Sequence, residues 1–318
     1  MARFPARTGA VERAFGKSGS TATDAAGMGD VMPMLLIKGV YRILGASPDG
    51  DSVRFYPDDP GEWDLLPGRK VRRNAAGGAQ LRLDGIDTLE THYRPPHGPE
   101  LHQPAPFAAG AAQELVDQLG FRKVRRNDQG IVESAEPASR PGYILTRSAD
   151  VYGRCIALAG KGRAPGTSGT AVRVSVTDLR RTLNHHQLAA GMAYPTFYRQ
   201  LFVDLRAELT AVVQEARKQK KGLWAADVTQ SGATVTALKS LTDEAVIMPK
   251  LFRRLADYLV LGDGDPSLAG FPAYLAQRDD RLLILSNGQW TSLDTVVQVA
   301  GNTVKLTHAP EDLVFDEK

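Results

Sequence analysis

Between residues 35 and 160, hydrophobic and polar positions alternate in short stretches, a pattern typical of β-strands. Residues 36–44 and 52–56 flank the turn Pro48-Asp49-Gly50 and predict a β-hairpin with Asp51 just after its turn. Residues 80–87 alternate so that Arg82 faces away from the neighbouring leucines. Residues 143–146 and 152–159 are two further candidates, so about five strands are expected.

Longer stretches with helical composition accompany these strands. Residues 107–119 place Leu115, Val116 and Leu119 on one apolar face, and residues 175–190 and 199–224 predict two more helices, the last ending near Gly222. Residues 128–141 form a polar insertion. About five strands and three helices predict an α+β protein with a five-stranded OB-fold-like β-barrel and helical cover.

The pattern changes after Thr229. Helical stretches at 235–246 and 249–261 precede a Gly/Asp/Pro-rich linker, and residues 282–307 alternate around the turns Asn287-Gly288 and Gly301-Asn302. We therefore expect a flexible N-terminal tail (1–34), an OB-fold-like domain (35–228) and a small α+β C-terminal module (229–318). No catalytic group stands out in this module, so regulation, a protein partner and self-association remain open as its role.

Charge is distributed unevenly along the chain. The net charge is only +3, but Arg-Lys-Val-Arg-Arg-Asn occurs at both 69–74 and 122–127, and residues 217–221 form a third basic cluster. Such clusters either contact a phosphate backbone or form solvated surface, and each alone fits both interpretations.

Several classes of protein are disfavoured. The first residues lack the apolar run of a secretory signal, and the apolar stretch at 32–37 is far shorter than the ~20 residues that cross a bilayer, so we expect a cytoplasmic protein without membrane contact. The single Cys155 lies in a strand-like stretch and is best explained as a small buried residue. Adjacent histidines on a helix point about 100° apart, so His185 and His186 are expected to be structural.

Four short, separated segments carry the most distinctive motifs of the sequence. They are Asp-Gly-Asp-Ser-Val at 49–53, Leu-Arg-Leu-Asp-Gly-Ile-Asp-Thr-Leu-Glu at 81–90, Asp-Val-Tyr-Gly-Arg at 150–154 and Lys-Gly-Leu-Trp at 221–224. In this order they resemble the staphylococcal nuclease, or thermonuclease, family over about residues 35–227. The resemblance implies a nuclease that cuts DNA or RNA at the 5′ P–O bond and leaves 3′-phosphate ends.

The resemblance also implies a divalent cation, Ca²⁺ with Mg²⁺ or another ion as alternatives, bound by Asp51, Asp87 and the backbone carbonyl of Thr88. Carboxylate and carbonyl oxygens suit such hard cations. Glu90 corresponds to the general base that activates water.

Arg82 and Arg154 correspond to the two arginines that bind the scissile phosphate, since a planar guanidinium can bind two phosphate oxygens at once. Tyr152 is placed to contact a terminal phosphate. Phe197 and Tyr198 are candidates for stacking on a base, although packing is the favoured interpretation for both.

Two departures from the family affect this assignment. Leu89 replaces the usual proline before Glu90, which is expected to loosen that loop, and Val151 replaces a lysine. A second hypothesis is therefore a catalytically weak or inactive module of the same fold that binds nucleic acid or a protein. Retention of the acidic residues and both arginines favours the nuclease.

Overall fold

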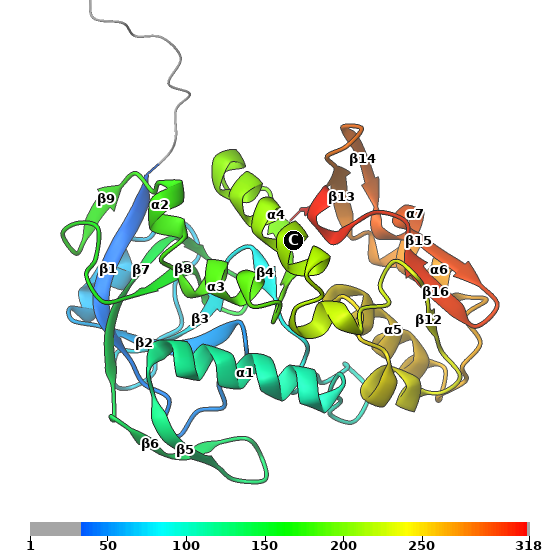
Figure 1. The fold of residues 1–318 in the computed structure, drawn as a ribbon, viewed down its shortest axis with the longest axis horizontal. Helices are drawn as coiled ribbons and strands as arrows, with labels where there is room; N and C mark the ends of the chain where they lie inside the picture. The colour runs from blue at the N-terminus through cyan, green and yellow to red at the C-terminus, as the bar shows by residue number, and fades with distance from the viewer. Residues whose placement is uncertain (1–32, 317–318) are drawn as a thin grey trace, which may run out of the picture. The chain divides into compact units, whose positions relative to one another are not determined.

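Five strands close into a small β-barrel. The computed structural model describes residues 33–316, and the barrel strands follow the order β1-β2-β3-β8-β7, with β7 pairing back onto β1. Only β3 and β8 are parallel neighbours. The strands are β1 (Met34–Tyr41), β2 (Ser52–Pro57), β3 (Ala79–Leu83), β7 (Arg140–Ala149) and β8 (Cys155–Lys161), and β9 (Thr170–Val172) extends the sheet beside β1 (Figure 1). The predicted five-stranded barrel is confirmed.

The predicted N-terminal tail falls almost entirely outside the described residues, and Met34 already belongs to β1. Ile37, Leu81, Ile144 and Ala159 share one face of the closed sheet by their register, and all four are fully buried. The first six residues of β8 are buried without alternation, because one face points into the barrel and α3 packs on the other.

Helices cover the barrel largely as predicted, with two differences. The helix expected at 175–190 is divided into α2 (Val176–Leu179) and α3 (Leu183–Ala189), because the Thr182 side chain caps a new helix by accepting from the backbone N–H of His185. The helix expected at 199–224 is α4 (Val203–Lys218), followed by a short 3₁₀ turn, Gly222–Ala225. The remaining helix, α1 (Ala105–Leu119), packs against α3.

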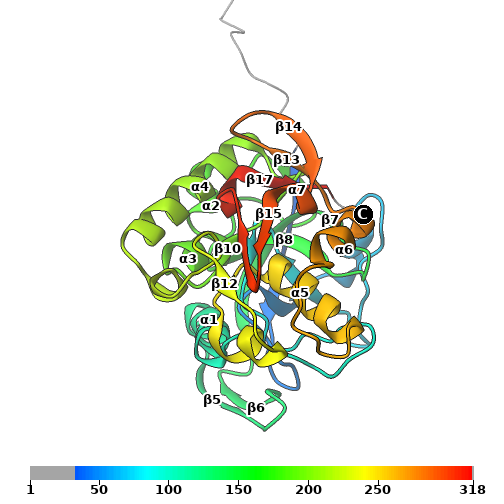
Figure 2. The same cartoon turned by 90° about the vertical axis from the view of Figure 1, so that its right-hand side faces the viewer.

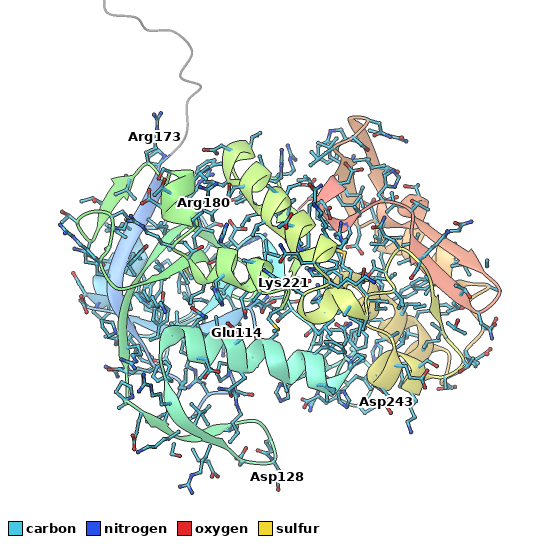
Figure 3. All side chains as sticks on the ribbon, viewed as in Figure 1. Glu114, Asp128, Arg173, Arg180, Lys221 and Asp243 are labelled. Carbon is cyan, nitrogen blue, oxygen red and sulfur yellow. The ribbon has the colours of Figure 1, made fainter. Side chains whose placement is uncertain are left out.

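The polar segment between α1 and β7 contains a hairpin that the sequence pattern did not predict. Its strands are β5 (Arg122–Arg126) and β6 (Val132–Glu136), and Asp128 lies at its tip (Figure 3). The second basic hexapeptide therefore contains all of β5, a largely exposed strand.

Residues 229–316 form two small sheets and several helices (Figure 2). Helix α5 (Pro249–Leu261) is as predicted, whereas of residues 235–246 only 238–244 are helical, and α6 (Phe271–Arg278) was not predicted. One sheet has the order β11-β17-β13-β14 and the other β12-β16-β15. Their strands are β11 (Phe197–Tyr198), β12 (Ala233–Thr234), β13 (Arg281–Ile284), β14 (Gln289–Ser292), β15 (Val297–Ala300), β16 (Thr303–Leu306) and β17 (Leu313–Phe315), with α7 (Leu293–Val296) between β14 and β15.

This C-terminal segment, residues 229–316, shares one hydrophobic core with the barrel and its helices. Strand β17 pairs in parallel with β11, and the rings of Tyr93 and Phe252 pack edge to face with centroids 6.0 Å apart. Arg217 on α4 makes two 2.7 Å hydrogen bonds to the buried Glu311 carboxylate. The domain boundary at residue 228 stays a prediction, but extensive packing crosses it. Within residues 33–316, no helix has the length and apolar character needed to span a bilayer.

Candidate active site

Three acidic side chains lie close together beside the C-terminal end of β3, where the Leu83 N–H donates to the Asp51 carbonyl at 2.8 Å. Asp51 lies directly before β2, Asp87 ends β4 (Ile86–Asp87), and Glu90 follows in the next loop. The backbone N–H of Thr88 donates to Asp51 Oδ2 at 3.1 Å, which holds the two segments together. We call Asp51, Asp87 and Glu90 the acidic cluster.

Two buried amides on α3 fix the turns that carry these residues. Gln187 donates to the carbonyl of Gly50 at 2.6 Å, next to Asp51, and Asn184 donates to the carbonyl of Asp84 at 2.8 Å, in the turn before Asp87. Gly50 itself is required, because a Cβ there would lie 2.6 Å from the Thr88 side chain. The positions of both aspartates are therefore set by packing as well as by the strands.

Arg82 and Arg154 line the same small cavity, whose volume is about 200 Å³. Arg82 projects from β3, donates to the Tyr198 hydroxyl at 3.2 Å and lies over the Tyr198 ring. Arg154 precedes β8, and its Nε donates to Asp150 Oδ2 at 2.7 Å. Two guanidinium groups from distant parts of the sequence thus face one space.

The turn that presents Arg154 is organised by Asp150. Its Oδ1 accepts from the backbone N–H groups of Tyr152 and Arg154, both at 2.9 Å. Gly153 has a φ of +80°, a conformation that glycine adopts without strain. The Asp-Val-Tyr-Gly-Arg motif is therefore a turn that orients the Arg154 side chain. Val151, in place of the family lysine, is exposed and also lines the cavity.

The three aromatic candidates differ in their surroundings. Tyr152 is 74% exposed, lines the cavity and lies near Arg154, so it is open to a ligand. Tyr198 is partly buried and also lines the cavity. Phe197 is fully buried and offers no ring face to a base, which agrees with the packing interpretation and removes it from the candidate binding residues.

Residues 80–226 match the family model described as staphylococcal nuclease homologue. The chain contains a staphylococcal-nuclease-like domain. The matched segment includes Arg82, Asp87, Glu90 and Arg154, and its fold is nuclease-like; Asp51 precedes it and the C-terminal segment follows it. A search among curated proteins found no match to the chain.

An arginine from outside the matched segment reaches the acidic cluster of this nuclease-like domain. Arg253, on α5, donates through Nη2 to Asp87 Oδ2 at 2.6 Å and through Nη1 to Asp87 Oδ1 at 3.3 Å. The same Nη1 donates to Glu90 Oε1 at 2.5 Å. The sequence analysis missed this residue. Its only signal is the spacing of Lys250, Arg253 and Arg254, which places three cationic side chains on one face of α5.

Burial raises the pKa of Asp51, and the nearby Asp49 and Asp87 carboxylates raise it further. Burial also disfavours the charged form of Asp87, but the Arg253 and Arg82 guanidiniums outweigh it and lower the pKa of Asp87. For Glu90, burial dominates over the attraction to Arg253, and the pKa is raised.

The loop that carries Glu90 is firmly held, contrary to the expectation from Leu89. Leu89 is only 1% exposed and packs in the core, so its apolar packing replaces the restriction that a proline ring would place on the backbone. The side-chain oxygen of Gln103, which is fully buried, accepts from the backbone N–H of Glu90 at 3.2 Å. The backbone N–H of Gln103 donates to the Glu90 carbonyl at 2.9 Å. Gln103 also donates to the carbonyl of Ile247 at 2.8 Å. This amide therefore joins the Glu90 loop to the C-terminal segment.

Two further cations of α5 lie at the arginine cavity. Lys250 and Arg254 both line it, and both contact Asp280, at 3.6 Å for Lys250 and at 2.8 Å for Arg254 Nη2. Burial favours the neutral form of Tyr198, yet Lys250 and Arg82 together lower the pKa of this tyrosine. The cavity is consequently a cationic environment built by both parts of the chain.

The donor set does not fit a resident divalent ion in this arrangement. Both carboxylate oxygens of Asp87 accept from Arg253, and Oδ2 of Asp51 accepts from the backbone N–H of Thr88. Across residues 33–316, no group of three or more His, Cys, Asp or Glu side chains is placed to hold a metal ion. The two histidines each contact a glutamate, His185 at 3.1 Å from Glu208 and His186 at 2.6 Å from Glu114. Glu114 lies on α1, where Figure 3 labels it.

Proposed function

We propose that this protein is a nuclease that hydrolyses phosphodiester bonds of DNA or RNA. The observation that carries the proposal is the shared cavity of Arg82 and Arg154. The acidic cluster does not line this cavity, but Arg82 is close enough to interact electrostatically with Asp87 and Asp51. Phosphodiester hydrolysis requires a cationic surface for the phosphate and a base for the attacking water, and these two groups of residues supply them.

Arg82 and Arg154 bind the scissile phosphate in this proposal. Each is oriented by a hydrogen bond, Arg82 to Tyr198 and Arg154 to Asp150, so little side-chain freedom is lost when an anion binds. Tyr152, exposed at the same cavity, contacts a neighbouring part of the nucleic acid. The attraction between the cationic side chains and the phosphate strengthens further as the phosphate gains negative charge in the transition state.

Glu90 acts as the general base that accepts a proton from the attacking water. Its loop is fixed by Gln103 and Leu89, which is the kind of support that a catalytic group needs to keep its position. The calcium requirement implied by the family resemblance stays a prediction, which the contacts of Arg253 to Asp87 and Glu90 oppose. The cytoplasmic location also stays a prediction.

The test is cleavage of a fluorescent single-stranded oligonucleotide and of plasmid DNA by the purified full-length protein. We expect Arg82→Ala and Glu90→Gln to lose activity, while Arg173→Ala and Glu133→Gln, at exposed positions outside the cavity, keep it. Equal cleavage by all five proteins would exclude this active site, and 3′-phosphate product ends would support the family's mode of cleavage.

A nucleic-acid-binding module without turnover is the second candidate, and Arg253 is the observation that favours it. This guanidinium holds both Asp87 and Glu90, the residues assigned to ligand binding and to base catalysis. Oligonucleotide binding that depends on Arg82 and Arg154, with no cleavage under any cation, would select this alternative.

A further inference from the structure

We propose that the Arg253 guanidinium takes the place of the divalent cation, so that the nuclease-like site contains a cation built into the chain and binds no metal ion between Asp51 and Asp87. This inference relies on the proposed function only to identify the site. It concerns occupation of the acidic cluster, which is measurable without any cleavage.

The first argument is geometric. A divalent cation in this site would need the Asp87 carboxylate as a ligand, and both of its oxygens accept hydrogen bonds from Arg253, at 2.6 and 3.3 Å. The same guanidinium also reaches Glu90, so it lies between the two carboxylates. The side chains of Asp87, Glu90 and Arg253 are 6%, 17% and 22% exposed, which leaves little solvent around the pair of contacts.

The second argument is charge balance. Two carboxylates, Asp87 and Glu90, face one shared guanidinium, and Arg82 adds a second positive charge close enough to interact with Asp87. The two arginines thus offset the charges of Asp87 and Glu90, two of the three carboxyl groups in the acidic cluster. Adding a divalent ion beside Arg253 would place like charges together, which electrostatic repulsion opposes.

The third argument is rigidity, because the helix that carries Arg253 is anchored on several sides. Its neighbours Phe252 and Leu255 are fully buried. Asp257, one turn further along α5, accepts a 2.7 Å hydrogen bond from Tyr93, in the loop that follows Glu90. Withdrawing the guanidinium by moving α5 would break these contacts, so a fixed cation fits better than a lid that opens readily.

The experiment is calcium titration of metal-stripped full-length protein, by calorimetry and by thermal unfolding with and without Ca²⁺. Wild type is expected to give no heat of binding at this site and no shift in Tm. Arg253→Met is expected to gain calcium binding and a rise in Tm of about 3 °C or more at saturating calcium, because a ligand that binds only the folded state stabilises it.

Two variants show whether that gain is specific. Adding Asp51→Asn to Arg253→Met should remove the calcium response. Arg217→Met breaks another ion pair between the same two parts of the chain, one that involves no residue of the acidic cluster, and should show no response. If Arg253→Met does not fold, Arg253→Gln serves in its place.

Calcium binding by wild type that is abolished by Asp51→Asn would overturn the inference. So would folded Arg253→Met or Arg253→Gln protein that binds no calcium, since the guanidinium would then not occupy a cation site. Failure of the nuclease assay with the predicted calcium results would reject the proposed function alone, so the two failures are distinguishable.

Discussion

Arg253 Nη2 lies 2.6 Å from Asp87 Oδ2 and joins residues 166 positions apart in the sequence. The contact places a side chain of the C-terminal segment within the acidic cluster of a nuclease-like domain. The C-terminal segment therefore contributes directly to the site, along with Lys250 and Arg254 at the adjoining cavity.

Gln103 is expected to position Glu90. Replacing it by Met removes the amide that contacts both the Glu90 backbone and the Ile247 carbonyl, so the loop should lose its fixed conformation. We expect kcat to fall by about tenfold with KM nearly unchanged, because the arginines that bind the substrate are not altered. Steady-state kinetics on an oligonucleotide measure both constants.

Gln113→Ala is the control for this prediction, since its side chain is exposed on α1 and contacts only Asp117 on its own helix among the hydrogen bonds found. An equal loss of kcat in both variants, or a change confined to KM for Gln103→Met, would argue against a positioning role.

Arg217 and Arg180 provide a matched pair for stability. Arg217→Met leaves the 5%-exposed Glu311 carboxylate without its bidentate partner, so the free energy of unfolding should fall by about 3 kcal/mol. Arg180→Met breaks a bidentate contact to Glu208 in which the arginine is exposed, and little change is expected. Urea denaturation of both variants gives the comparison, and equal effects would contradict the argument from burial.

Cys155 should be unreactive in the folded protein. Burial raises the pKa of its thiol to about 12, so almost no thiolate is present at pH 8. A colorimetric disulfide reagent is expected to label it slowly in buffer and rapidly in concentrated urea. Fast labelling of the folded protein at pH 8 would show that the strand around Cys155 opens readily.

Local patterns predicted the barrel well, helped by strands such as β2 and β3 in which buried and half-buried positions alternate. The turn from Asp150 to Arg154 was not predicted, because residues 152–159 were expected to form a strand, whereas β8 begins only at Cys155. The hairpin after α1 was missed because Val132 is the one fully buried residue of β5 and β6, so no apolar alternation marks it. The divided helix at 175–190 depends on one capping residue, Thr182, which periodicity does not reveal.

Arg253 was not predictable in the same way. On α5 it resembles an ordinary polar residue of an amphipathic helix, and nothing nearby in the sequence indicates partners as distant as Asp87 and Glu90. The anchoring role of Gln103 was likewise hidden, because a buried amide is recognised only once its partners surround it. Contacts that depend on how separate segments pack lie beyond what local spacing specifies.

The most direct measurement of the central claim is kcat/KM for oligonucleotide cleavage by wild type, Arg82→Ala, Arg154→Ala and the double variant. Because both arginines face one cavity and hold one phosphate, each single change should lower kcat/KM by about 100-fold or more. The double variant should lose less than the product of the two single losses. Wild-type rates in either single variant would contradict the account.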